Sequence, residues 1–385
     1  MIPLSALSTP CLLVDDARLR DNIRRMQDTA DTNEVALRPH TKTHKSLRIA
    51  RRQQDAGAQG ITVAKVAEAE TFVRAGFDDV RVAYCVAGRE KHERLAQLMD
   101  RARVSFCVDT EAGAKAASKV YADADRVAEV VIEVDVGHGR CGVPWDTDAG
   151  VRLARRIDEL PGLRCVGILT HAGQSYHGPE DGETPEDALR RTAAAERDRM
   201  LDLATRLHDA DIPGVTPDAF EISIGSTPTI GYFENRVEDG FAITEIRPGN
   251  YVFYDAIQVG LGAATLDHCA LTVLTTVISR RGDRCYLDAG KKVVTTDTGS
   301  GTDGYGTLLA DPAAMTPLGG ATITGLSEEH GWVRLDGDAD LQVGDRVRFV
   351  PNHACVTVNT QDEMHLVDGA NVAGTLPVDA RGAVT

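Results

Sequence analysis

The 385-residue sequence predicts a (β/α)8 TIM barrel followed by an all-β domain, and three observations support this fold class. Eight short apolar runs alternate with helix-like segments up to about residue 250, as in a barrel of parallel strands and outer helices. From residue 251 onward, β-branched runs are separated by Gly and Asp turns without helical periods. The main alternative is a doubly wound open sheet, but no Gly-x-Gly-x-x-Gly dinucleotide motif follows the first strand.

Apolar runs bounded by turn residues mark the strands of the barrel. They occupy residues 35–38, 60–64, 79–84, 104–108, 129–135, 165–170, 219–224 and 243–247. Helix-like segments rich in Ala, Arg, Glu and Leu connect most of them, at residues 46–56, 67–75, 89–102, 111–121, 147–159 and 185–210. Only the last connection, 227–242, lacks a long helical period. A further strand at 11–15 and an amphipathic segment from Asp16 to about Thr29 come before the barrel.

The β domain is expected to occupy residues 251–385, after a barrel domain of residues 1–250. Its clearest strand-like runs lie at 270–278, 284–288, 331–335 and 345–350. Residues 1–15 are expected to pair with this domain, although they stand at the other end of the chain. The stretch 294–320, rich in Gly, Thr, Ser and Asp, is predicted to be a long loop, and loops of that length tend to be functional.

The composition, with 42% hydrophobic and 26% charged residues, is typical of a soluble globular enzyme. The net charge of -16 argues against binding to nucleic acid or to an anionic membrane. No apolar run approaches the length of a membrane span, and the N-terminus has no signal-peptide pattern. The eight cysteines are scattered singly without a Cys-x-x-Cys pair, which indicates free thiols in a reducing cytoplasm.

The segment Val35–Ser46 carries the first functional signal. It starts as a buried strand and ends in His40, Lys42, His44 and Lys45, at the C-terminal face of the barrel where active sites collect. A lysine at the mouth of a strand can have its pKa lowered by an apolar wall, as an imine-forming lysine requires. The residues alone do not decide between the two lysines.

Small polar residues follow the last two barrel strands. Ser226 and Thr227 come directly after the seventh strand, and Gly249, Asn250 and Tyr251 follow the eighth. Their backbone N–H groups and hydroxyls can hold a phosphate dianion, as in other barrels. Together with a strand-end lysine, this pattern indicates pyridoxal 5'-phosphate.

The glycine-rich turn Gly137–Gly142 after the fifth strand presents His138 and Arg140. We expect Arg140 to face the pyridine nitrogen of the cofactor. A fixed cation there would keep the nitrogen unprotonated and moderate the electron-withdrawing power of the ring.

The segment Pro351–Thr357 carries a candidate metal site in His353 and Cys355. Residues at positions i and i+2 of an extended segment project to the same side, so an imidazole and a thiolate could bind one ion. The soft thiolate favours Zn²⁺, with Mn²⁺ and Mg²⁺ as alternatives.

These blocks together resemble the fold-type III, alanine racemase-like pyridoxal-phosphate enzymes, in the branch of D-threonine aldolase, D-serine dehydratase and D-threo-3-hydroxyaspartate dehydratase. The similar blocks are Arg38–Lys45, Thr170–Tyr176, Gly225–Thr229, Glu245–Asp255 and Pro351–Cys355. The resemblance implies that Lys42 carries the imine and that His40, His171 and Tyr176 also contact the cofactor. It further implies a divalent metal, a D-amino acid substrate with a β-hydroxyl group, and a homodimer in which the partner completes the active site.

The His-x-Cys pair is similar to that of the dehydratases, whereas aldolases more often have His-x-Asp. We therefore expect a dehydratase that forms a 2-oxo acid and ammonia, with Lys42 removing the Cα proton. The alternative is an aldolase that forms glycine and an aldehyde, with His171 or His177 as the base. A racemase and a non-catalytic pyridoxal-phosphate carrier are the remaining alternatives; a racemase needs a second base that the sequence does not identify.

Overall fold

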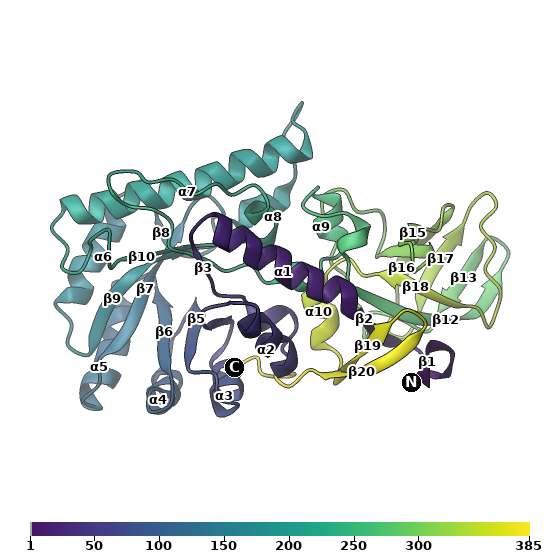
Figure 1. The fold of residues 1–385 in the computed structure, drawn as a ribbon, viewed down its shortest axis with the longest axis horizontal. Coiled ribbons are helices and arrows are strands. Elements are labelled where there is room, and N and C mark those ends of the chain that lie inside the picture. Colours follow the sequence, from purple (N-terminus) through teal and green to yellow (C-terminus); the bar gives the residue numbers. More distant parts are fainter. Residues whose placement is uncertain (1) are drawn as a thin grey trace.

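The computed structural model describes residues 2–385 and shows a curled parallel sheet beside a second, mostly antiparallel sheet (Figure 1). Around the curled sheet, the strands follow in the order β3 (Ala36–Leu37), β11 (Glu245–Ile246), β10 (Glu221–Ile224), β9 (Leu163–Thr170), β7 (Ala128–Asp135), β6 (Arg103–Val108), β5 (Asp79–Cys85) and β4 (Ile61–Val63). A parallel bridge between His40 and Thr62 joins the two ends of this order. Each predicted barrel strand coincides with one of these eight, so the predicted fold class is confirmed.

Helices cover the outside of the barrel (Figure 1). They are α2 (Leu47–Asp55), α3 (Val66–Arg74), α4 (Arg89–Leu98), α5 (Glu111–Asp123), α6 (Ala149–Asp158) and α7 (Pro185–Asp209). The strands are apolar because one face meets these helices and the other lines the barrel interior. Helix α7 begins where Thr184 Oγ1 accepts the Asp187 N–H at 3.2 Å and Pro185 occupies the first turn. Within residues 2–385, no helix is long and apolar enough to cross a membrane.

Short elements shape the C-terminal face of the barrel. They are η2 (Thr41–Thr43), β8 (Val143–Pro144), η3 (Gly173–His177), α8 (Thr227–Ile230), η4 (Asn250–Val252) and α9 (Ala256–Gly260). As expected, the connection 227–242 carries no long helix in the described chain, only α8.

The second sheet combines both ends of the chain. Its main order is β1 (Ile2–Pro3), β20 (Asn371–Pro377), β19 (Glu363–Asp368), β2 (Cys11–Asp15), β12 (Leu271–Arg281), β13 (Arg284–Leu287), β17 (Gly331–Leu335) and β16 (Ala321–Leu326). Strand β2 pairs with β12 on one side and β19 on the other. Helix α1 (Asp16–Thr32) then leads from this sheet to the barrel (Figure 1). The short helices η1 (Leu4–Ala6) and η5 (Leu266–His268) flank β2 and β12 in the sequence.

The predicted loop 294–320 is only partly a loop. Its second half forms β14 (Thr307–Asp311) and β15 (Thr316–Pro317), which pair with each other, and β14 also pairs with β18 (Arg346–Val350). The local sequence did not reveal β14 because its partner β18 lies more than thirty residues further along the chain, and β15 pairs with β14 alone.

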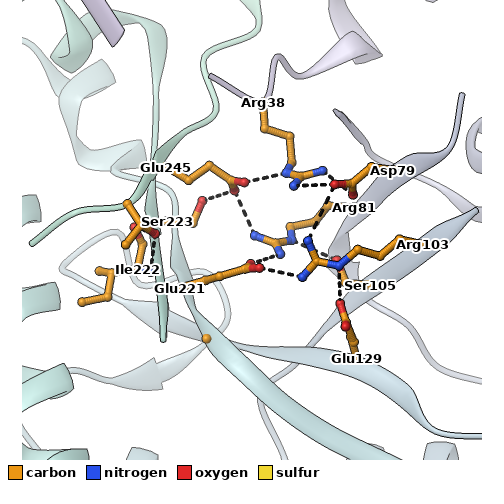
Figure 2. A network of polar contacts seen from close by, with 12 residues as sticks. Arg38, Asp79, Arg81, Arg103, Ser105, Glu129, Glu221, Ile222, Ser223 and Glu245 are labelled. Carbon is orange, nitrogen blue, oxygen red and sulfur yellow. Dashed lines mark hydrogen bonds and ion pairs between the residues drawn. The ribbon is translucent and has the colours of Figure 1, made fainter. Parts of the chain in front are cut away.

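An ionic network fills the barrel interior toward the N-terminal ends of the strands (Figure 2). At its centre, the guanidinium group of Arg81 is completely buried and pairs with Glu245 and Glu221. Arg38 pairs with Glu245 at 2.5 Å and with Asp79 at 2.6 Å. Burial raises the pKa of Glu245, but Arg81 and Arg38 more than offset this and hold it at about 2. The interior of this barrel is thus partly ionic rather than wholly apolar.

Replacing the central arginine, Arg81→Met, is expected to destabilise the protein by about 3–5 kcal/mol, because buried carboxylates would lose their cation. Urea unfolding measures the change. The control is Arg103→Met: Arg103 pairs with Glu221 and Glu129 in the same network, but its side chain is 42% exposed. This control should cost no more than about 1 kcal/mol. Equal losses in the two variants would contradict the central role of Arg81.

Candidate active site

Two adjoining cavities open at the C-terminal ends of the barrel strands. The first has a volume of about 440 Å³ and lies over the barrel mouth, and the second, about 300 Å³, extends toward the β domain. Both are lined by His40, Lys42, His171, Gly225 and Arg247, so these residues stand where the cavities meet. The chain therefore brings strand-end residues from several elements to one site.

The position of Lys42 separates it from Lys45. Lys42 lies in η2, directly after β3, and lines both cavities; burial lowers the pKa of its ammonium group. Lys45 is buried elsewhere, with its Nζ 3.1 Å from Glu68 Oε1. Lys65 lines only the first cavity, with its Nζ 4.1 Å from the centroid of the Tyr84 ring. Lys42 is thus the lysine positioned between the two cavities.

The predicted phosphate cradle lines the second cavity, where Ser226, Thr227, Gly249 and Asn250 come together. A Cβ atom on Gly249 would lie 2.8 Å from the backbone oxygen of His40, so glycine is needed for this close approach. Two hydroxyl groups beside closely approaching backbone fit a dianion such as the phosphate of pyridoxal 5'-phosphate.

Arg140 lines the first cavity, but its side chain is 54% exposed and its Nη2 lies 3.5 Å from Glu133 Oε1. The buried guanidinium at the junction of the cavities belongs instead to Arg247, which donates to Ser223 Oγ and to the Thr170 backbone oxygen. The sequence interpretation counted Arg247 as the last residue of a strand and so missed it. Its place at a strand end, directly before Pro-Gly-Asn, could have identified Arg247 as a candidate site residue.

His138 and His171 are two of the histidines that line the second cavity. His171 Nδ1 donates to the Gly225 backbone oxygen at 3.0 Å, and burial, with a smaller contribution from Lys42, lowers the pKa of His171 to about 3. His138 packs so closely on Gly173 that a Cβ there would lie 2.4 Å from its ring. His171 is therefore a neutral imidazole, and the glycine of the His-Ala-Gly block leaves room for His138.

Of the remaining predicted site residues, one lines the second cavity and two line neither cavity. Tyr176 lines the second cavity, and its hydroxyl accepts from Gln258 Nε2 at 3.3 Å. The side chain of Tyr251 is fully buried, and its hydroxyl accepts from Gln53 Nε2 at 2.8 Å, so it points into the core rather than to a cofactor. His177 is exposed and lines neither cavity; its ring centroid lies 6.2 Å from that of His138. The structure thus leaves Tyr251 and His177 outside the site.

His353 and Cys355 do not lie on an extended segment, as the sequence interpretation assumed. Cys355 lies in the first turn of the short helix α10 (Ala354–Asn359), and His353 is its N-cap residue. The helix forms because the buried Asp255 carboxylate accepts the Ala354 N–H at 2.9 Å, a contact between distant parts of the chain. Both side chains nevertheless line the second cavity, and the Cys355 Sγ lies 3.2 Å from Thr43 Oγ1, next to Lys42.

The electrostatics of this pair favour a thiolate. Burial raises the pKa of Cys355, but His353 and Lys42 outweigh it, so the net pKa is lowered. The Nδ1 of His353 donates to Asp297 Oδ2 at 2.7 Å, which orients the ring. Within residues 2–385, no group of three or more His, Cys, Asp or Glu side chains could hold a metal ion. The imidazole of His353 and the thiolate of Cys355 would offer a metal ion two protein ligands, and the cavity that they line would leave positions for substrate.

Asp297 lies in the first half of the 294–320 stretch, whose role the sequence did not reveal. If it orients a metal ligand, Asp297→Asn should lower metal affinity by about 10–100-fold while the fold is retained. Competition with a fluorescent chelator measures the affinity. The matched control is Asp303→Asn in the same stretch, which should leave the affinity unchanged; a fall in both variants would assign the effect to the stretch as a whole.

Residues 14–256 match the family model of the alanine racemase N-terminal domain, and residues 270–367 match a serine dehydratase domain. The chain is 35% identical over 367 residues to D-threo-3-hydroxyaspartate dehydratase of Delftia sp. (strain HT23), covering 92% of each protein. It is 35% identical over 390 residues to D-threonine aldolase of Arthrobacter sp., covering 99% of this chain and 94% of that protein. The solved structure of the Delftia enzyme superposes with a TM-score of 0.86, at 33% identity, over 98% of this chain and 99% of that one. The chain therefore belongs to the alanine racemase N-terminal domain family.

Proposed function

We propose that this chain is a lyase that uses pyridoxal 5'-phosphate and a divalent metal to convert a D-β-hydroxy-amino acid into a 2-oxo acid and ammonia. D-threo-3-hydroxyaspartate and D-serine are the proposed substrates. The observation that carries the proposal is the placement of His353 and Cys355 on the same cavity as Lys42. A pyridoxal-phosphate carrier would have no use for a metal-binding pair beside its lysine.

The residues that would hold the cofactor are Lys42 at its aldehyde end and Ser226, Thr227, Gly249 and Asn250 at its phosphate. The cofactor would supply an electron-withdrawing ring at Cα, and the metal would supply a Lewis acid for the β-oxygen. Arg247, rather than the half-exposed Arg140, is the cation buried at the junction of the two cavities.

The residues of the chain then have separable tasks. Because burial lowers its pKa, Lys42 can accept the Cα proton of the substrate. His353 and Cys355 would hold the metal that orients the β-hydroxyl group. They lie close to Lys42, since Cys355 contacts Thr43, the residue that follows Lys42 in the chain. Loss of water and later hydrolysis leave the carbon chain as a 2-oxo acid and the nitrogen as ammonia.

The second candidate function is a D-threonine aldolase-type cleavage to glycine and an aldehyde, which the full-length similarity to D-threonine aldolase supports. It requires a base for the β-hydroxyl proton. His177 lies outside the cavities, and His171 has a pKa of about 3 and is a weak base. These two observations favour the dehydratase.

Product analysis separates the two reactions. Purified protein loaded with pyridoxal 5'-phosphate and Zn²⁺ is offered D-serine, D-threonine and both D-3-hydroxyaspartate diastereomers, with and without chelator. Ammonia with a 2-oxo acid supports the dehydratase. Glycine with an aldehyde refutes it in favour of the aldolase, and no turnover of any of them refutes both.

Three finer assignments belong to the same proposal. The thiolate of Cys355 favours Zn²⁺ over Mn²⁺ and Mg²⁺. We place the enzyme in the cytoplasm because all eight cysteines are free thiols. We also propose a homodimer, the assembly that the resemblance to the fold-type III enzymes implies. Light scattering of the purified protein tests the dimer.

A further inference from the structure

A buried carboxylate lies directly behind the phosphate cradle. Glu196 of α7 is completely inaccessible to solvent. Its Oε1 accepts the Gly225 N–H at 3.1 Å, and its Oε2 accepts the Thr229 hydroxyl at 3.1 Å. Among residues 2–385, no Lys or Arg forms an ion pair with it, so an ionised Glu196 depends on these hydrogen bonds and on the more distant charge of Arg247. The proposed mechanism assigns no role to Glu196.

A short chain of hydroxyl groups connects Glu196 with the cavity. Thr229 Oγ1 lies 3.0 Å from Ser226 Oγ, and Ser226 lines the second cavity together with Lys42. Thr229 Oγ1 also lies 3.1 Å from the Ser226 backbone oxygen, and Ser226 Oγ lies 3.3 Å from Ser175 Oγ and 3.5 Å from the Ala172 backbone oxygen. The order from the protein interior outward is therefore carboxylate, threonine hydroxyl, serine hydroxyl, cavity.

The direction of this chain depends on the charge of Glu196, because each hydroxyl has a single proton to donate. Among the partners of Ser226, only Thr229 changes with the charge of Glu196. When Glu196 is ionised, Thr229 donates to it and offers its oxygen at 3.0 Å as an acceptor for the Ser226 proton, which then points away from the cavity. When Glu196 is protonated, it donates to Thr229, which donates to Ser226. The Ser226 proton is then free to bind an anion in the cavity.

We propose that Glu196 couples binding of the cofactor phosphate at Ser226 to the uptake of one proton through Thr229. This inference rests on the proposed function only in taking the phosphate of pyridoxal 5'-phosphate as the anion. The same protonation also removes a negative charge from behind the dianion, so both effects favour binding.

Both charge states of Glu196 are accessible near neutral pH. Burial raises its pKa, the hydrogen bonds from Gly225 and Thr229 and the charge of Arg247 partly offset this, and the net pKa is about 7. Arg247, with its pKa lowered to about 10 mainly by burial, stays charged near neutrality. His171, with a pKa of about 3, stays neutral.

Other ionisable groups on the elements that pack against α7 leave this assignment unchanged. Helix α8 has none. In η3, burial raises the pKa of Tyr176, which stays neutral, and His177 is exposed. In β10, Glu221 lies at the opposite end of the strand and pairs with Arg81. The remaining ionisable groups on elements packed against α7 lie at the start of β9 and in α6. They are Arg164, Cys165, Arg152, Arg155, Arg156 and Asp158.

The sign of the effect follows from linkage. The protonated form binds the anion better, so affinity for the cofactor falls as the pH rises above about 7. The fall can approach about tenfold per pH unit until the pKa of the bound state is reached. Glu196→Gln, which imitates the neutral carboxyl, should remove this part of the pH dependence and bind more tightly than wild type at about pH 8.5.

The experiment titrates pyridoxal 5'-phosphate into apoenzyme by calorimetry, at several pH values and in two buffers of different ionisation enthalpy. It gives the dissociation constant and the number of protons taken up. Protons exchanged by the cofactor and by Lys42 are common to all variants and cancel in the comparison. We expect wild type to take up more protons than Glu196→Gln at about pH 7.5, with an affinity that falls at least about threefold more between about pH 7 and about pH 8.5.

Two variants of the connecting hydroxyl provide the matched comparison. Thr229→Ser keeps a hydroxyl and should retain the proton uptake, whereas Thr229→Val should lose it. The valine variant also decides the question if Glu196→Gln does not fold. Equal proton uptake in wild type, Glu196→Gln and Thr229→Val would overturn the inference while cofactor binding remains intact. No binding of the cofactor by wild type would overturn both the inference and the proposed function.

Discussion

Lys42→Ala is expected to lower kcat by about 10⁴-fold, since both the covalent anchor of the cofactor and the proposed base are lost. The amine of Lys42 is the one that stands between the two cavities, with its pKa lowered by burial. The visible absorbance that a lysine-bound pyridoxal phosphate gives should disappear in the same variant. Steady-state ammonia release and an absorbance spectrum measure the two effects.

The control for this prediction is the neighbouring Lys45. Lys45→Ala should keep the visible absorbance, because this lysine pairs with Glu68 away from the cavities. Its effect should be on stability, since it leaves a buried carboxylate without its cation; such a loss costs about 3–5 kcal/mol. Loss of the absorbance in Lys45→Ala or Lys65→Ala, with Lys42→Ala unaffected, would assign the cofactor to a different lysine.

Removal of either proposed metal ligand should have the second large effect. His353→Ala and Cys355→Ala are each expected to lose the bound metal and to lower kcat/KM by about 10²–10⁴-fold, because the Lewis acid contributes several kcal/mol to the removal of a poor leaving group. Metal content by elemental analysis and turnover with added Zn²⁺ measure the result. Chelation of the wild-type enzyme should reproduce the loss, and Zn²⁺ should restore it.

A buried cysteine elsewhere in the β domain separates loss of a ligand from a general effect of removing a thiol. Cys285→Ala removes a buried thiol of β13 that lines neither cavity, and it should keep the metal and the activity. Full activity of His353→Ala after exhaustive chelation would refute a role for the metal.

The barrel was predictable because its signal is repeated and local. Few folds other than a barrel match eight apolar runs with helical connections. The C-terminal ends of those predicted strands already placed Lys42, Ser226 and Thr227 on one face. The second cavity brings these three residues together with His353 and Cys355. The assignment of individual roles within this site remains a prediction.

What the sequence did not reveal depends on contacts between distant residues. Arg81 and Arg38 lie within apolar strand runs, and only the structure shows that they neutralise carboxylates across the barrel. The helix α10 has a β-branched sequence and forms because Asp255, about a hundred residues earlier, binds its first turn. Asp297 has no motif around it, and only its 2.7 Å contact with His353 indicates a role.

Strand β2 lies between β12 and β19, although more than 250 residues separate it from β12 in the chain. During synthesis on the ribosome, β2 therefore stays unpaired until nearly the whole polypeptide has emerged, whereas each barrel strand meets a neighbour sooner. A fragment of residues 251–385 would lack its central strand and expose the edges of β12 and β19, which invites aggregation. A circular permutant that joins the two termini and begins at about residue 251 would instead bring β2 into the same continuous stretch of chain as its partners.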